Sequence, residues 1–138
     1  MYKELSIEAA LAYMDGSGIE IIKPKQHAEG PIGTRYEVVI NRRGELETMC
    51  TFRALISSLV IVAEEFELTG TKNMYAPPHR ELFLKVALTK VIQWAQQQAK
   101  KNVVVYSDDT LMPNLLMDAN FSIQSGRNGK KVRGFKAL

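Results

Sequence analysis

The sequence predicts a single α/β (α+β) domain over residues 1–138, built on a mixed central sheet that is flanked by helices. Residues 79–99 carry apolar side chains at helical spacing over their whole length, which indicates a long helix with one buried face. The segments on both sides of it alternate apolar and polar residues or are short apolar runs, as strands are. A chain of 138 residues can bury about two thirds of its extended surface in one core, and no low-complexity linker divides it.

The N-terminal part of the chain predicts one helix and three short strands. Ser6 can cap a helix that reaches Ala12 or Met14 and ends at Gly16 and Gly18. The strands are expected at residues 19–22, 36–40 and 46–52. A turn-rich stretch joins the last two strands, which are therefore expected to pair antiparallel.

Residues 52–68 allow two interpretations. Apolar residues from Phe52 to Phe66 recur at helical spacing, whereas the β-branched run LVIV at 59–62 is typical of a central strand. On the second interpretation a strand covers 59–68 and follows a turn at Ser57-Ser58. The residues alone leave both interpretations open.

The C-terminal part begins with the long helix and a buried strand. Pro77 and Pro78 suit a helix start, where a missing N–H costs little, and Trp94 is expected in the core. Residues 103–106 (VVVY) form an apolar run without alternation, which predicts a strand buried on both faces.

A short helix comes next, and it is expected to be capped at both ends. Asp109 or Thr110 can supply the N-cap oxygen, and Pro113 falls in the first turn. Asn120 is expected to have φ > 0, because asparagine tolerates the left-handed conformation that closes helices. A hairpin ends the chain, with its strands and turn expected at 121–124, 132–138 and Asn128-Gly129.

Composition and charge exclude several classes of protein. A net charge of +3 with 46% hydrophobic and 24% charged residues is ordinary for a globular protein, and no apolar stretch approaches the ~20 residues that span a bilayer. The N-terminus does not read as a signal peptide. Cys50 is the one cysteine and cannot form an internal disulfide, and His27 and His79 lack metal-ligand spacing. The sequence therefore predicts a cytoplasmic protein without a metal site or a membrane contact.

The C-terminal end is basic. Residues 125–138 contain no acid and hold Arg127, Lys130, Lys131, Arg133 and Lys136. Such a cluster can bind nucleic acid, an anionic cofactor or an acidic protein partner. The same pattern is equally typical of a solvated hairpin edge that lysines keep from pairing.

The order of the C-terminal elements resembles that of the GNAT-type N-acyltransferases. In that family a long helix and a strand precede a short helix with the pattern N-x-x-x-x-x-LY-x-x-x-GF, and here the matching positions hold Asp109, Leu115-Leu116 and Asn120-Phe121. The resemblance covers residues 79–138, and the earlier elements also fit the family's order, which favours the strand at 59–68. It implies a GNAT-like fold and a divergent acyl-CoA-dependent N-acyltransferase. Such an enzyme transfers an acyl group from acetyl-CoA or another acyl-CoA to the amine of a small molecule or a peptide.

The resemblance also implies which residues would form the site. The family binds the pyrophosphate of acyl-CoA with a Q/R-x-x-G-x-G/A turn, but the matching segment here, 79–84, contains no glycine. The cofactor-binding candidates are therefore Thr69, Gly70, Thr71, Lys72, Asn73 and Arg80. Leu116 stands where the family often has its general-acid tyrosine, so Tyr75 or Tyr106 is the candidate acid. The candidates for the general base are Glu64 and Glu65.

Two other readings of the sequence stay open. The missing glycines favour a non-catalytic protein of the same fold, which would bind a protein or a nucleic acid through Arg127, Lys130, Lys131 and Arg133. The other is an unrelated α/β fold in which residues 52–68 form a helix.

Overall fold

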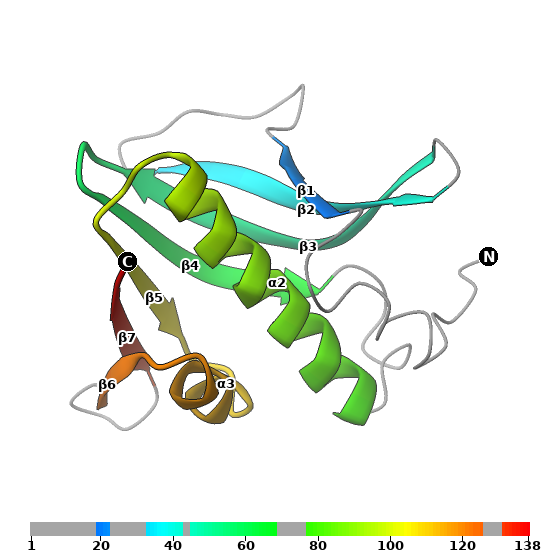
Figure 1. Cartoon of the computed structure of the whole chain (residues 1–138). Coiled ribbons are helices and arrows are strands. Elements are labelled where there is room, and N and C mark those ends of the chain that lie inside the picture. The colour runs from blue at the N-terminus through cyan, green and yellow to red at the C-terminus, as the bar shows by residue number, and fades with distance from the viewer. Residues whose placement is uncertain (1–18, 23–32, 43–44, 69–76, 126–130) are drawn as a thin grey trace.

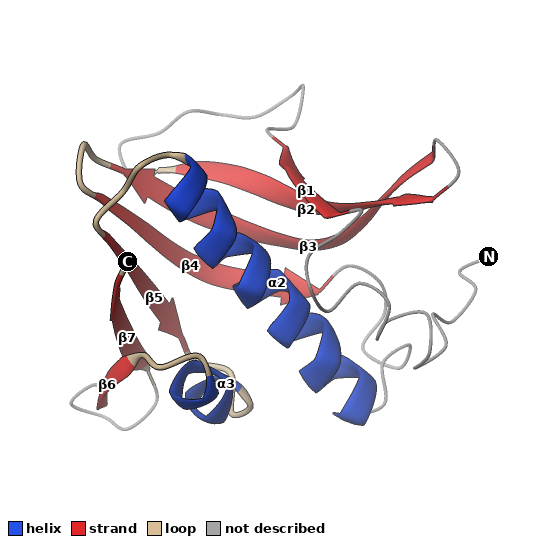
Figure 2. Ribbon diagram, viewed as in Figure 1, coloured by secondary structure: helices blue, strands red, loops and turns tan. Residues whose placement is uncertain are grey.

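The described part of the chain folds around one seven-stranded sheet, which the computed structural model shows in Figures 1 and 2. The structure describes residues 19–22, 33–42, 45–68, 77–125 and 131–138. The elements are β1 (Ile19–Ile22), β2 (Thr34–Arg42), β3 (Glu45–Ile56), β4 (Val60–Leu68), α2 (Pro77–Gln97), β5 (Asn102–Ser107), α3 (Met112–Asp118), β6 (Ser122–Ser125) and β7 (Val132–Ala137). The strands lie in the order β1-β2-β3-β4-β5-β7-β6. The predicted helix from Ser6 lies outside the described residues.

The sheet is mixed, as predicted. Neighbouring strands pair antiparallel, with the exception of β4 and β5, which run parallel. Parallel neighbours need a crossover connection, and α2 lies in the one that joins β4 to β5. The α/β fold class with a mixed sheet and flanking helices is therefore confirmed.

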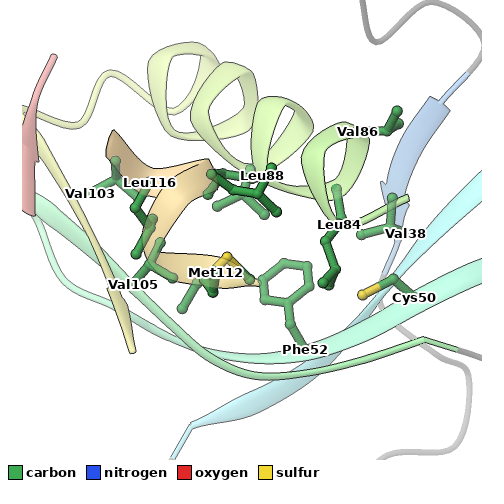
Figure 3. Packing of buried hydrophobic residues seen from close by; sticks show 14 of the residues in the cluster. Val38, Cys50, Phe52, Leu84, Val86, Leu88, Val103, Val105, Met112 and Leu116 are labelled. Atoms are coloured by element: carbon green, nitrogen blue, oxygen red, sulfur yellow. The ribbon is translucent and has the colours of Figure 1, made fainter. Parts of the chain in front are cut away.

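Both described helices cover the same face of the sheet. Figure 1 shows α2 running obliquely across the strands, with α3 beside it near β5 and β7. The close view in Figure 3 shows side chains of α2, α3 and the sheet meeting in one apolar layer. Its largest fully buried members include Phe52, Ile61, Leu84, Met112 and Leu116.

The long helix predicted at 79–99 is confirmed, with bounds two residues earlier. Its buried residues are Phe83, Leu84, Val86, Ala87, Leu88, Val91 and Ala95, while Trp94 is partly buried against the core. Leu84 and Leu88 extend the buried side of α2 beyond a single narrow stripe. They are buried because α2 packs on α3 as well as on the sheet, which widens its buried side. None of the helices in the described part of the chain has the length and apolar character that crossing a membrane requires.

Residues 52–68 form strands, so the helical interpretation is wrong. The strand β3 continues four residues past its predicted end at Phe52, and β4 begins at Val60. The turn between them is closed by a hydrogen bond of 2.9 Å from the Ser57 N–H to the Val60 carbonyl. The apparent helical spacing combines the apolar residues of two separate strands, the end of β3 and the start of β4, each of which contributes side chains to the core.

The short helix α3 ends as predicted. Asn120 has φ 65°, and the Phe121 N–H donates to the Leu116 carbonyl at 2.9 Å. At the other end the prediction was wrong, because the N-cap residue is Leu111 and makes no side-chain capping bond. The Asp109 carboxylate instead accepts from the Leu111 N–H at 2.9 Å, in the turn before the helix.

The closing hairpin is confirmed as an antiparallel pair, with Ser125 opposite Val132 and Ser122 opposite Phe135. Its predicted turn at Asn128-Gly129 lies outside the described residues.

Candidate functional site

The parallel strands β4 and β5 pair over only part of their length. Val60 to Ala63 lie opposite Asn102 to Val105, and the pairing stops there. Beyond this point β4 continues to Leu68 along β3, and β5 continues to Ser107 along β7. Backbone groups on the facing edges of β4 and β5 therefore have no ladder partner across the sheet. We call this place the β4–β5 divergence.

A β-bulge lies at the divergence. Glu65 has φ 55°, which is uncommon for a residue other than glycine, and the register of β3 against β4 shifts between Thr51 and Arg53. The extra residue changes which side chains face inward. Ala63 is buried in the core. In a regular strand Glu65, two positions later, would also face the core, but the bulge turns Phe66 inward in its place. Phe66 then stacks on Phe52 at a ring-centroid distance of 5.4 Å.

Two of the predicted catalytic residues lie at matching positions of the divergence. The pairing between β4 and β5 ends at Ala63 and Val105. Glu64 and Tyr106 directly follow these two residues, so they would form the next pair in the β4–β5 register. Both point away from α2 and α3, because their neighbours Ala63 and Val105 are fully buried on the inner face. We call the opposite side of the sheet the outer face. Both side chains are half-buried there.

Glu65, the other candidate base, is held in an ion-pair cluster. Its Oε2 lies 3.1 Å from Arg35 Nη2 and 3.5 Å from Arg53 Nη2. Arg35 also donates through Nη1 to Thr51 Oγ1 at 3.0 Å and lies 4.0 Å from a Glu67 oxygen. The two guanidinium groups therefore hold the Glu65 side chain within this ion-pair cluster.

Glu64 has different surroundings. Its cross-strand neighbour is Arg53, but the Arg53 guanidinium is turned to Glu65. Within the described residues the Glu64 side chain has no hydrogen bond or ion pair. The geometry therefore favours Glu64 over Glu65 as a general base.

Tyr106 contacts two cations, Arg133 of β7 and Lys131, which directly precedes that strand. Its hydroxyl oxygen accepts a hydrogen bond of 3.2 Å from Arg133 Nε, and the two residues are direct cross-strand partners. Lys131 Nζ lies 5.7 Å from the centroid of the Tyr106 ring. Two residues of the predicted basic cluster therefore lie next to a predicted catalytic residue.

The predicted cofactor-binding residues are mostly outside the described part of the chain. This holds for Thr69, Gly70, Thr71, Lys72 and Asn73, for the alternative acid Tyr75, and for Arg127 and Lys130 of the basic cluster. The backbone of Arg80 lies in the first turn of α2. That turn starts with Pro77 and Pro78, which have no N–H, so two of the four free donors of a helix N-terminus are missing.

Leu116, which matches the family's tyrosine, belongs to the core. It is fully buried, and a Cβ added to Gly134 would come within 3.0 Å of its Cδ1. A side chain at this position has no access to the outer face, so Tyr106 is the described tyrosine that can act there.

The remaining titratable groups do not suggest a metal centre. Among the described residues no three His, Cys, Asp or Glu side chains lie together as metal ligands would. Burial raises the pKa of the Cys50 thiol to about 12, so this cysteine stays protonated and unreactive.

Sequence reasoning missed the bulge, although its signal is present. Inward residues of β4 fall at Ile61 and Ala63 and then at Phe66, so the alternation slips by one at Glu64-Glu65. A break in a period of two within one strand is the mark of an inserted residue.

Comparison with known proteins shows the fold. No protein-family model matches the sequence, and no curated protein matches it either. A GNAT family acetyltransferase from Elizabethkingia anophelis, solved with acetyl-CoA bound, superposes with a TM-score of 0.53 at 12% identity, over 88% of this chain and 99% of that one. The C-terminal condensation domain of Ebony, in complex with beta-alanyl-dopamine, superposes with a TM-score of 0.56 at 7% identity, over 75% of this chain and 72% of that one. A domain from Methanocaldococcus jannaschii superposes with a TM-score of 0.53 at 8% identity, over 99% of this chain and 96% of that one. The chain therefore has a divergent GNAT-like fold.

Proposed function

We propose that the protein is an acyl-CoA-dependent N-acyltransferase, of the acetyltransferase kind, that acylates the amine of a small molecule or a peptide. One observation carries the proposal. A carboxylate without a partner among the described residues, Glu64, and a phenol, Tyr106, occupy matching positions on one face of the β4–β5 divergence. Direct acyl transfer to an amine needs one group that accepts a proton and one that donates a proton on either side of the reacting carbonyl.

Glu64 would act as the general base and Tyr106 as the general acid. Acyl-CoA supplies the activated thioester carbonyl. Glu64 accepts the proton of the attacking amine, directly or through a water molecule, and Tyr106 donates its proton to the departing sulfur. The unpaired backbone edges of β4 and β5 can hydrogen-bond the extended arm of the cofactor as a neighbouring strand would.

The phosphates of the cofactor would depend on side chains. Since Pro77 and Pro78 remove two N–H donors from the start of α2, the helix terminus is a weak anion site. The side chains of Lys72 and Arg80 are therefore proposed as the principal phosphate contacts, and Thr69, Gly70, Thr71 and Asn73 as further cofactor-binding residues. Lys72→Ala and Arg80→Ala are each expected to weaken acetyl-CoA binding about tenfold, with strong dependence on salt.

Acetyl-CoA binding tests the proposal most directly. Calorimetry and thermal shift with millimolar acetyl-CoA are expected to show saturable binding and a raised melting temperature. Acetylation of a panel of primary amines is then expected to fall about 100-fold in Glu64→Gln and in Tyr106→Phe, while both variants still bind acetyl-CoA. Glu67→Gln, an exposed carboxylate on the same strand, is the matched control and should keep the wild-type rate. If the wild-type protein shows no binding heat and no thermal shift with acetyl-CoA, the proposed function is ruled out.

The competing proposal is a binding protein that holds nucleic acid or an acidic protein through Arg127, Lys130, Lys131 and Arg133. It predicts salt-dependent association with such a partner and no binding of acetyl-CoA. The contacts of Lys131 and Arg133 with Tyr106 favour a role for these two cations within the site instead.

A further inference from the structure

The outer face of β5 and β7 carries an alternating row of cations and aromatic rings. Lys131 Nζ lies over the Tyr106 ring at 5.7 Å, Arg133 Nε bonds the Tyr106 hydroxyl at 3.2 Å, and the Arg133 guanidinium carbon lies 6.0 Å from the centroid of the Phe135 ring. Register explains the arrangement, because Tyr106 and Arg133 are directly opposite in the antiparallel ladder. The guanidinium is therefore fixed from two sides, by a hydrogen bond and by an aromatic face.

The direction of the hydrogen bond determines what Tyr106 can still do. A phenol can accept and donate at once, whereas a guanidinium can only donate. Arg133 therefore occupies a lone pair of the Tyr106 oxygen and leaves the phenolic hydrogen free, and among the described residues no acceptor takes that hydrogen. β7 lies on one side of β5 and the β4–β5 divergence on the other, so Tyr106 stands between Arg133 and the divergence.

We infer that Arg133 is a positioning residue, which holds Tyr106 as a proton donor and stabilises the phenolate that donation leaves. The inference rests on the proposed acyl transfer. In that step the amine nitrogen forms the C–N bond as the C–S bond breaks. The amine proton passes to Glu64, the sulfur takes the phenolic proton, and the Tyr106 oxygen becomes negative while Arg133 donates to it. Glu64 then releases its proton to solvent and the Tyr106 phenolate takes one up from solvent, so that both residues are restored and the net products are an amide and the CoA thiol.

Nitration by tetranitromethane tests the inference without knowledge of the acceptor amine, because the reagent attacks the phenolate form of tyrosine. Peptide mass spectrometry after limited nitration gives the rate at Tyr106. In the wild-type protein Tyr106 should react faster than Tyr36, which packs against Phe52 and Trp94. Arg133→Gln should slow nitration of Tyr106 about threefold to tenfold. Arg133→Lys keeps the charge but not the planar donor, so its nitration rate at Tyr106 should lie between those of the wild type and Arg133→Gln. Arg35→Gln, a cation on the far side of the divergence, is the control and should leave the Tyr106 rate unchanged.

The outcomes separate this inference from the proposed function. An unchanged or faster Tyr106 rate in both Arg133 variants, with melting temperatures near that of the wild type, would overturn the role of Arg133. Slower nitration in wild-type protein on addition of acetyl-CoA would support both proposals, because it places the cofactor beside the same phenol. Slower nitration in the Arg133 variants without binding of acetyl-CoA would uphold the Arg133–Tyr106 coupling and end its assignment to acyl transfer.

Discussion

The Phe52 ring lies at the centre of the core, and its removal should be among the most damaging single changes in this protein. Phe52 is fully buried, and its ring centroid lies 5.8 Å from that of Tyr36, 5.4 Å from Phe66 and 5.8 Å from Trp94. Phe52→Ala loses the burial of the ring and leaves a cavity, which costs about 3–5 kcal/mol. Three aromatic contacts, each worth about 0.5–1.5 kcal/mol, place the expected loss at the upper end of that range.

A loss of about 5 kcal/mol is a large part of the stability of a domain this size, which is about 5–15 kcal/mol. Urea denaturation followed by Trp94 fluorescence measures it, because Trp94 is the one tryptophan and contacts Phe52 edge-on. Phe52→Leu keeps most of the volume and should lose about 1–2 kcal/mol. Tyr36→Phe keeps the ring and should change the free energy of unfolding by less than about 1 kcal/mol. A loss below about 1 kcal/mol in Phe52→Ala, with unchanged Trp94 emission, would refute the aromatic cluster as the centre of the core.

Other predictions follow from buried or strained positions. Val91 is fully buried on α2, so Val91→Asp should unfold the domain, and a soluble variant with cooperative melting would contradict the assigned helix face. Asn120 has φ 65°, so Asn120→Gly should be neutral or stabilising, whereas Asn120→Val should lose about 1–2 kcal/mol in urea unfolding. Burial raises the pKa of Cys50 from 9.0 to about 12, so its stabilising contribution is complete below pH 9 and is lost as the pH rises towards 12. In that window wild-type stability should fall more steeply than that of Cys50→Ala, by up to about 1.4 kcal/mol per pH unit, and parallel pH profiles would contradict the burial of the thiol.

The local structure of this protein follows from its sequence alone. The helical period predicted α2, alternation and β-branching predicted the strands, and the left-handed preference of asparagine predicted the end of α3 at Asn120. These properties belong to a single turn or a short segment, so they are present before the chain folds. The sequence also contained the slip in alternation at Glu64-Glu65, although a break of one residue is easily read as the end of a strand.

Which of the candidate residues lie together at the β4–β5 divergence depends on the tertiary structure. The sequence named Glu64 and Glu65 together, and the cross-strand positions of Arg35 and Arg53 distinguish them by pairing with Glu65. The sequence placed Arg133 in a basic tail, and the register of β5 against β7 set it on the Tyr106 hydroxyl. Contacts of this kind join residues far apart in the chain and depend on which strands are neighbours, in which register and where they separate. No local preference encodes those choices, because they follow from the packing of the whole sheet against α2 and α3.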